Sequence, residues 1–321
     1  MTRMPISFSL VARVDRLLSW VRPLRISLPI IRNAASTRVG WFITPALTHH
    51  ILCGRISPAL YKAPTYAAMI NKQDATLLFE QPLIEGRLIK RYKRFLADIE
   101  LADGSMTTVH CPNPGAMLGL KEPGLPAWIA DSGNPKRKLR YTLELLKADG
   151  DLVGINTNRP NKIAEKAILN GLIKELPIPD GCSLRREVKY GQNSRIDLMI
   201  AHDQDETAPK TFIEIKNVHL RRLDVADGRT AEFPDSVTSR GAKHLQELSD
   251  QVTAGHHAVM LYVVQRMDCE RFGLASDIDP AYAKAFVAAQ AAGVEMLAYQ
   301  CHIDLTGITL AKPLDIPPVV L

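Results

Sequence analysis

The sequence lacks the features that would place the protein in a membrane or in an oxidising compartment. Its 321 residues contain no stretch approaching the ~18 uninterrupted apolar residues of a membrane helix. Its five cysteines are odd in number and scattered, which argues against a disulfide framework and against a zinc site. Internal repeats and low-complexity segments are also absent. These absences favour a globular protein of about two domains in a reducing compartment, and we expect it to be cytoplasmic.

Acidic residues are nearly missing from the first 68 positions. Residues 1–68 hold nine Lys or Arg against Asp15 alone, a net charge of +8. The whole chain carries +6, so residues 69–321 carry −2. The overall charge is therefore no argument for nucleic-acid binding, which must rest on local clusters.

Three interpretations of this basic segment compete. A transit peptide would explain the arginine bias, although the density of prolines argues against one long amphipathic helix. A secretory signal is disfavoured because arginines interrupt every apolar run. We favour a mis-assigned start, in which translation begins at Met69. On any interpretation we expect residues 1–75 to form a weakly ordered basic extension.

The pattern of residues 80–157 is typical of short strands separated by turns. Asp103-Gly104 and Asp149-Gly150 are turn signals of the hairpin kind. About five short strands in such a length predict a small barrel or sandwich. The expected strands cover residues 88–101, 106–111, 127–130, 138–146 and 152–156.

The pattern changes to alternating helices and strands over residues 158–315, which predicts an α/β layered domain. Ser236, Thr238 and Ser239 are candidate caps of one helix. With such caps available, the preceding Phe233-Pro234-Asp235 needs no functional explanation. The expected helices cover residues 161–176, 239–253 and 281–292, and the expected strands lie around 185–200, 211–218, 258–264 and 295–302.

The most informative residues are Asp197, Glu214 and Lys216, on two successive predicted strands. Because side chains alternate along a strand, Glu214 and Lys216 share a face about 7 Å apart, while Ile213 and Ile215 point into a core. Asp197 is a lone carboxylate among apolar neighbours on the preceding strand. Metal-dependent phosphodiester cleavage uses this arrangement, in which carboxylates hold a divalent ion and the lysine positions or activates the attacking water.

Glu165 is the candidate third carboxylate. On a helical wheel it falls on the arc of Leu169, Leu172 and Leu176, where a carboxylate is costly to bury unless it is paired or bound to a metal. A glutamate at the helix edge that reaches solvent or a lysine explains the same position at least as well.

Structural alternatives also exist for the other acidic positions. Glu214 and Lys216 fit a half-exposed strand face, and Glu-x-Lys alone is common. Asp197 could pair at the strand end with one of three arginines, Arg185, Arg186 or Arg195. Three carboxylates without a cation would repel and raise one another's pKa. The three carboxylates taken together therefore favour a bound divalent cation, Mg²⁺ or alternatively Mn²⁺. Its expected ligands are Glu165, Asp197 and Glu214, and Lys216 is the expected electrostatic helper.

Two basic runs lie in the predicted barrel, over residues 90–95 and 135–140. Basic side chains engage phosphates, and an interleaved tyrosine can stack on a base. A solvated surface is the structural alternative, and binding is favoured if the two runs share a face. The candidate nucleic-acid ligands are Lys90, Arg91, Tyr92, Lys93, Arg94, Lys136, Arg137 and Lys138.

A constrained loop follows the second predicted strand, at residues 110–117. Asn113 beside Gly115 could offer side-chain and backbone donors to a phosphate, so Asn113 joins the nucleic-acid candidates. Turn chemistry alone explains the same residues.

At these residues the chain resembles the sugar fermentation stimulation protein A family through most of residues 83–315. The segments that carry the resemblance are residues 88–98, 110–117, 136–138, 187–191, 194–197, 213–216, 233–235 and 240–245. The resemblance implies an OB-like barrel at 80–157 and a PD-(D/E)XK nuclease-like α/β domain at 158–315. By position, the nuclease-type motif falls on Glu165, Asp197, Glu214 and Lys216.

The resemblance also implies DNA binding and a role in regulating sugar-use genes, such as those for maltose. Two departures stand out. Family members lack residues 1–68, and the loop reads Asn-Pro-Gly where Asn-Thr-Gly is expected. Pro114 removes a backbone donor at that spot.

We therefore expect a DNA-binding protein with a metal-dependent phosphodiesterase site. RNA as the ligand and a homodimer as the assembly remain open, and no membrane partner is expected. The main alternative is a non-catalytic transcriptional regulator on a nuclease scaffold. A third class, a sugar or nucleotide sensor, would show ligand-dependent melting without affinity for DNA.

Overall fold

The computed structural model describes residues 75–191, 194–225 and 228–319. The expected basic extension and the start at Met69 lie outside the described residues, apart from Ala75. In the part of the chain that is described, no helix is long and apolar enough to cross a membrane.

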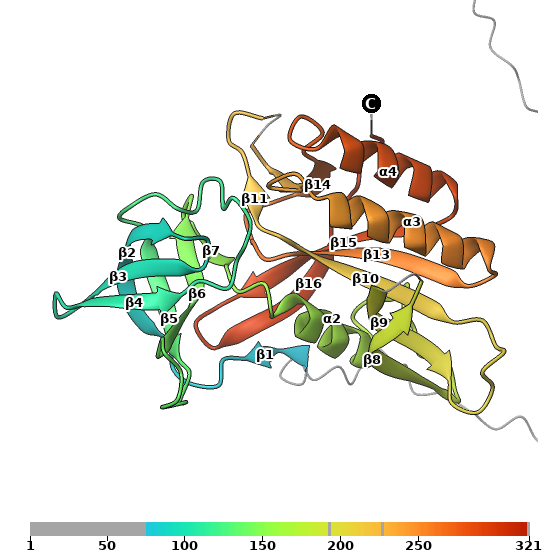
Figure 1. Cartoon of the computed structure of the whole chain (residues 1–321), viewed down its shortest axis with the longest axis horizontal. Coiled ribbons are helices and arrows are strands. Elements are labelled where there is room, and N and C mark those ends of the chain that lie inside the picture. The colour runs from blue at the N-terminus through green and yellow to red at the C-terminus, as the bar shows by residue number, and fades with distance from the viewer. Residues whose placement is uncertain (1–74, 192–193, 226–227, 320–321) are drawn as a thin grey trace, which may run out of the picture. The chain divides into compact units, whose positions relative to one another are not determined.

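A small barrel forms the first part of the described chain (Figure 1, cyan to green). Its strand order is β4-β3-β2-β5-β6-β7, and a β4–β6 pairing at His110 and Thr142 closes it. Ile99, Ile129 and Leu143 are fully buried inside. Of the barrel and the sandwich that the short strands predict, the structure has the closed barrel. The strands are β2 (Ile84–Tyr92), β3 (Leu96–Leu101), β4 (Met106–His110), β5 (Pro126–Asp131), β6 (Tyr141–Ala148) and β7 (Asp151–Gly154).

The single strand predicted over residues 88–101 is wrong, because the chain turns back between β2 and β3. Lys93 and Arg94 have φ values of 48° and 62°, in the left-handed region that few non-glycine residues adopt. No Gly, Pro, Asn or Asp marks the reversal, so the sequence carries no turn signal there. The first basic run therefore lies along β2 through Tyr92 and continues onto a tight hairpin turn at residues 93–95.

A seven-stranded mixed sheet is the centre of the α/β domain, with the order β1-β16-β15-β13-β10-β9-β8. Helix α2 covers one face, and α3 and α4 cover the other (Figure 1). A smaller sheet, β11-β12-β14, lies beside it. The helices are α2 (Pro160–Leu169), α3 (Ser239–Thr253) and α4 (Pro280–Ala291). The main-sheet strands are β1 (Leu77–Leu78), β8 (Cys182–Tyr190), β9 (Ser194–His202), β10 (Thr211–Val218), β13 (His257–Val264), β15 (Glu295–Ile303) and β16 (Gly307–Pro313); the others are β11 (Leu220–Arg221), β12 (Thr230–Phe233) and β14 (Arg271–Leu274).

Two expected elements differ from the structure. The strand expected at 185–200 is the hairpin β8–β9. The helix expected to reach residue 176 ends at Leu169, because Asn170 occupies the C-cap position and Gly171 adopts φ 66°, which glycine tolerates without strain. Among the candidate caps of α3, Thr238 accepts a hydrogen bond from the Gly241 amide at 3.1 Å.

Buried charges join the barrel to the α/β domain. Arg266 is only 1% exposed and donates to Asp149, in the β6–β7 turn, at 2.9 Å and to Asp268 at 2.7 Å. Arg221 pairs with Asp268 at 2.6 Å. We call these four residues the junction cluster. Its two cations and two carboxylates make it electrically balanced.

Candidate metal centre and nucleic-acid surface

Strands β9 and β10 separate at the acidic residues. Their antiparallel pairing covers Thr211 with Ile200 through Ile213 with Leu198 and stops there. The Asp197 carboxylate then accepts the Ile215 amide at 2.8 Å, which satisfies a donor that the ended ladder leaves without a strand partner. Asn161 of α2 donates to the other oxygen of Asp197 at 2.8 Å. The separation opens the sheet surface next to Asp197.

Glu214 is held on one of its two carboxylate oxygens. Lys216 Nζ donates to Glu214 Oε1 at 2.7 Å, and His244 Nδ1 on α3 contacts the same oxygen. Arg240 Nε donates to His244 Nε2 at 3.2 Å, so that ring nitrogen accepts and Nδ1 carries the proton towards Glu214. Glu214 is 3% exposed, and its Oε2 has no hydrogen-bond partner among the described residues.

The two neighbouring carboxyl groups titrate in opposite directions. Burial and the nearby charge of Glu214 raise the pKa of Asp197 to about 6. Burial alone would raise the pKa of Glu214 as well, but the His244 hydrogen bond and the charge of Lys216 outweigh it and hold that pKa below its ordinary value. Such divergence is characteristic of groups arranged to bind or to react.

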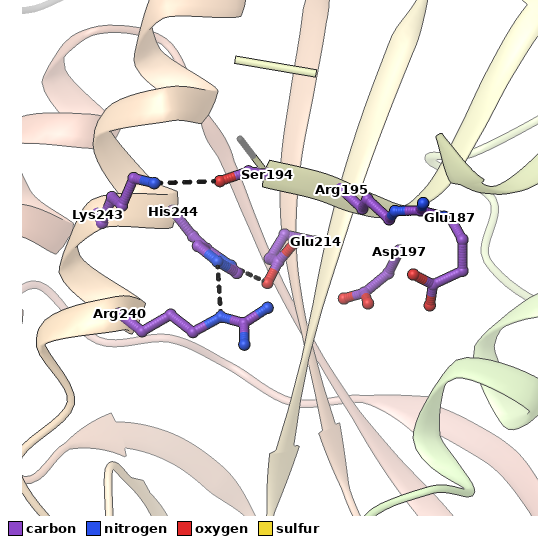
Figure 2. Close-up of a pocket in the computed structure, with 8 residues that line it drawn as sticks. All are labelled: Glu187, Ser194, Arg195, Asp197, Glu214, Arg240, Lys243 and His244. Carbon is purple, nitrogen blue, oxygen red and sulfur yellow. Dashed lines mark hydrogen bonds and ion pairs between the residues drawn. The ribbon is translucent and has the colours of Figure 1, made fainter. Parts of the chain in front are cut away.

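A pocket of about 460 Å³ opens over these residues (Figure 2). Its acidic lining comes from β8, β9 and β10, and its cationic lining comes from β9 and α3. A second pocket beside α2 shares Glu187 and Asp197 with the first. The first pocket is lined by Glu187, Ser194, Arg195, Asp197, Glu214, Arg240, Lys243 and His244.

The structure places the remaining predicted site residue, Glu165, differently. Its carboxylate pairs with Arg186 of β8 and lines only the second pocket, together with Asp197. Within residues 75–191, 194–225 and 228–319, no three His, Cys, Asp or Glu side chains already stand in a metal-holding cluster. Asp197 and Glu214 thus share the first pocket, Lys216 contacts Glu214, and Glu165 shares the second pocket with Asp197.

Sequence reasoning missed Glu187 and His244. Glu187 has φ 51°, so a residue in the middle of β8 adopts a left-handed conformation. Its flanking pairs, Arg186 with Leu198 and Val188 with Ile196, place it opposite Asp197. Strand alternation gives no sign of either feature. The spacing of residues along α3 does not reveal the contact of His244 with Glu214, which depends on how α3 approaches β10.

The first basic run ends in the turn between β2 and β3, and the second lies in the loop between β5 and β6. The turn residues Lys93, Arg94 and Phe95 are exposed, and Phe95 is 45% exposed. Leu96 next to this turn pairs with His110, and His110 bridges to Thr142 just after the second run. Partial burial and the charge of Arg137 lower the pKa of His110. His110 thus pairs with residues that flank the two basic runs.

Other members of the runs have internal partners. Lys90 pairs with Asp98 at 3.3 Å, and the Tyr92 hydroxyl donates to Asp98 at 3.0 Å. Arg91 donates to the carbonyl oxygens of Asn113 and Gly115 at 2.7 and 2.9 Å. Lys136, Arg137 and Lys138 are exposed.

The Asn113 side chain holds the loop from inside. Asn113 is 1% exposed, accepts the Gly115 amide at 2.9 Å and donates to the Ile155 carbonyl at 3.3 Å. In this structure its side chain is not on the surface that a phosphate would reach, and turn chemistry accounts for it.

Besides preceding the cap of α3, the segment Phe233-Pro234-Asp235 makes a structural contact that the sequence did not indicate. The Asp235 carboxylate accepts the Met117 amide of the barrel loop at 3.0 Å and lies 3.4 Å from His219 Nε2. A Cβ at Gly115 would come within 2.3 Å of Asp235, so only glycine permits this approach. The segment therefore fastens the barrel loop to the α/β domain.

Comparison with protein families decides the assignment. The model for the SfsA N-terminal OB domain matches residues 89–155, and that for the sugar fermentation stimulation protein RE domain matches residues 158–307. A sugar fermentation stimulation protein homolog of Maricaulis maris is 53% identical over 238 residues, covering 74% of this chain and 97% of the relative. The chain belongs to the SfsA family. A homolog from Brucella ovis is also 53% identical, over 72% of this chain and 94% of the relative.

A solved SfsA structure shares the fold. Pyrococcus furiosus SfsA, in complex with Ca²⁺, is 26% identical, with a TM-score of 0.65 over 75% of this chain and 98% of that one. The predicted family is confirmed, as is the predicted order of an OB barrel followed by an α/β domain.

Proposed function

We propose that this SfsA protein binds nucleic acid, DNA in the first instance, and hydrolyses phosphodiester bonds with a divalent cation, Mg²⁺ or Mn²⁺. One observation carries the proposal. Asp197 and Glu214 line one open pocket, and a buried carboxylate oxygen of Glu214 has no hydrogen-bond partner among the described residues. Leaving such an atom unpaired is costly unless a ligand satisfies it.

The donor set fits a hard cation. Carboxylate oxygens are the ligands that Mg²⁺ and Ca²⁺ prefer, and a cation would relieve the repulsion that raises the pKa of Asp197. The Ca²⁺ complex of the Pyrococcus furiosus protein supports the same inference. When bound, the ion would supply positive charge at the scissile phosphate and acidify a water.

The chain's own residues complete the site. Lys216 holds the Glu214 carboxylate and brings a positive charge next to it, and His244 fixes the same oxygen from α3. Arg195, Arg240 and Lys243 line the pocket and offer charge to the phosphates of a bound strand.

The barrel end supplies the nucleic-acid surface in this proposal. Exposed Lys93 and Arg94 and the exposed ring of Phe95 combine phosphate contacts with a stacking platform. Arg137 and its neighbours Lys136 and Lys138 extend the positive surface beyond His110.

A second candidate function, a non-catalytic regulator of sugar utilisation on this scaffold, is favoured by two observations. Glu165 is engaged by Arg186, and no preformed metal cluster exists in the described parts of the chain. Such a protein would bind DNA through the barrel without cutting it.

A cleavage assay on single-stranded, double-stranded and plasmid DNA and on RNA, with Mg²⁺, Mn²⁺ or EDTA, separates the two. We expect metal-dependent cleavage that Lys216→Ala and Asp197→Ala each reduce about 10²–10³-fold. Lys284→Ala, on the exposed side of α4, is the matched control and should leave cleavage unchanged. If wild type and variants bind DNA equally and none cuts, the hydrolase proposal is wrong and the regulator stands.

A further inference from the structure

Strand β8 changes faces at Glu187. Before it, Cys182 and Leu184 pack on the α2 side of the sheet; after it, Val188 and Tyr190 pack on the α3 side. Strict alternation would keep all four on one side, because they are spaced by even numbers. The left-handed φ of 51° at Glu187 accounts for the switch.

The partner strand changes faces at the same level. Ile196 packs on the α3 side, whereas Leu198 and Ile200 pack on the α2 side. Asp197 lies between them, opposite Glu187 in the hairpin register. The two carboxylates therefore occupy the crossing point of β8 and β9, where neither is committed to a packed core.

The Glu187 side chain is available at this crossing. It is exposed, lines both pockets, and makes no hydrogen bond or ion pair with the described residues. Figure 2 shows its carboxyl group directed into the same pocket as that of Asp197. Glu165, by contrast, is held in an ion pair with Arg186.

We infer that the divalent cation of this site is held by Asp197, Glu214 and Glu187, and that Glu165 serves to anchor Arg186. The inference rests on the proposed metal-dependent function and specifies its ligand set. Three observations support it: the register opposite Asp197, the shared pocket, and the buried Glu214 oxygen without a partner in the described chain. A left-handed glutamate within a strand is strained, and such strain persists where the surroundings enforce it.

Direct binding of Mn²⁺ and of Ca²⁺ to the full chain, measured by calorimetry without nucleic acid, tests the inference. We expect Glu187→Gln to weaken affinity about tenfold or more and Asp197→Asn to weaken it at least as much. Glu165→Gln should change affinity less than about threefold if it acts only through Arg186. Glu206→Gln, an exposed glutamate in the β9–β10 connection, is the charge-matched control.

Glu187→Gly separates ligand loss from misfolding. Glycine adopts φ 51° without strain, so this variant should melt no lower than wild type and still bind the cation as weakly as Glu187→Gln. The inference is overturned if Glu165→Gln weakens binding more than Glu187→Gln does. It is equally overturned if Glu187→Gln matches Glu206→Gln, or if wild type binds neither cation.

The cleavage assay tests the proposed hydrolysis separately. Absence of cutting alongside the expected order of cation affinities would reject hydrolysis and keep the ligand set. Cleavage that depends on Glu165 and not on Glu187 would support hydrolysis and reject the ligand set.

Discussion

The junction cluster and the candidate metal centre each gather charged side chains around a buried one, Arg266 and Glu214 respectively, but their charges are paired differently. In the junction cluster, Arg266 and Arg221 face Asp149 and Asp268 in equal number. In the centre, Lys216 and the His244 ring contact Glu214, whereas Asp197 forms no ion pair with the described residues although Arg195, Arg240 and Lys243 line the same pocket.

The difference extends to single atoms. Among the described residues, three of the buried side-chain atoms that lack hydrogen-bond partners belong to Glu214, Tyr190 and Glu247. Burial raises the pKa of Tyr190, and the negative charges of Glu214 and Glu247 raise it further. No atom of the junction cluster lacks a partner in this way. The junction cluster is satisfied as folded, whereas the centre leaves buried atoms open to the cation that we propose.

Removing a cation from the junction cluster should have the largest effect on stability. Arg266→Met leaves Arg221 as the one cation of the junction cluster for both Asp149 and Asp268, which should cost about 3–5 kcal/mol of unfolding free energy. Urea unfolding measures it. Arg140→Met, which breaks the exposed pair with Asp131, should change stability far less. Equal losses in the two variants would remove the contrast between a buried network and a surface pair.

Removing the Asp197 charge from the metal centre should raise the unfolding free energy, whereas removing Arg266 lowers it. Because the pKa of Asp197 is raised to about 6 from 3.8, its contribution to stability is full below 3.8 and is lost as the pH rises through 6. In EDTA at pH 7.5, Asp197→Asn should therefore raise the unfolding free energy by up to about 3 kcal/mol, with the gain disappearing near pH 4.

The same variant should lose the stabilisation that Mn²⁺ gives to wild type. Thermal melts across pH, with and without the metal, measure both effects. A destabilised Asp197→Asn in EDTA at pH 7.5 would show that the Asp197 carboxylate is structural, like those of the junction cluster.

Asp235 should behave like a junction residue. Burial alone would raise its pKa, but His219 and the Met117 amide lower it to about 2, so its stabilisation is present above 3.8 and is lost as the pH falls through 2. Asp235→Asn should cost about 2 kcal/mol at pH 7, by urea unfolding. Asp180→Asn, in an exposed loop, is the control, and a loss shared by both variants would contradict the role of Asp235.

The smallest expected effect is on nucleic-acid affinity. Phe95→Ala removes an exposed ring and should weaken binding of single-stranded DNA by about 1 kcal/mol, without lowering the melting temperature. Anisotropy titrations measure the affinity. Leu305→Ala, at an exposed apolar position in the β15–β16 turn, provides the comparison, and equal affinities of the two variants would exclude stacking at Phe95.

Periodicity and order along the chain predicted the barrel, the α/β domain and the strand that carries Glu214 and Lys216. Long alternating or apolar runs, such as His257–Val264, specify their state because burial enforces one pattern. The tight turn at Lys93 and Arg94 and the face switch at Glu187 could not be predicted. Both depend on left-handed backbone at residues that normally avoid it, imposed by tertiary contacts.

The same limit applies to the site. Spacing placed Glu165, Asp197 and Glu214 in the expected order but could not show that Arg186 engages Glu165, since that contact depends on how α2 lies on β8. The pairing of Asp235 with the barrel loop is equally long-range and has no local signal.

Anomalous diffraction from crystals of the full chain grown with Mn²⁺ tests the central claim most directly. The account predicts a peak in the pocket, within coordination distance of both Asp197 and Glu214, at about 2.0–2.3 Å as hard cations take oxygen ligands. A peak confined to surface carboxylates, with the Asp197–Glu214 pocket holding only water at saturating metal, would contradict it.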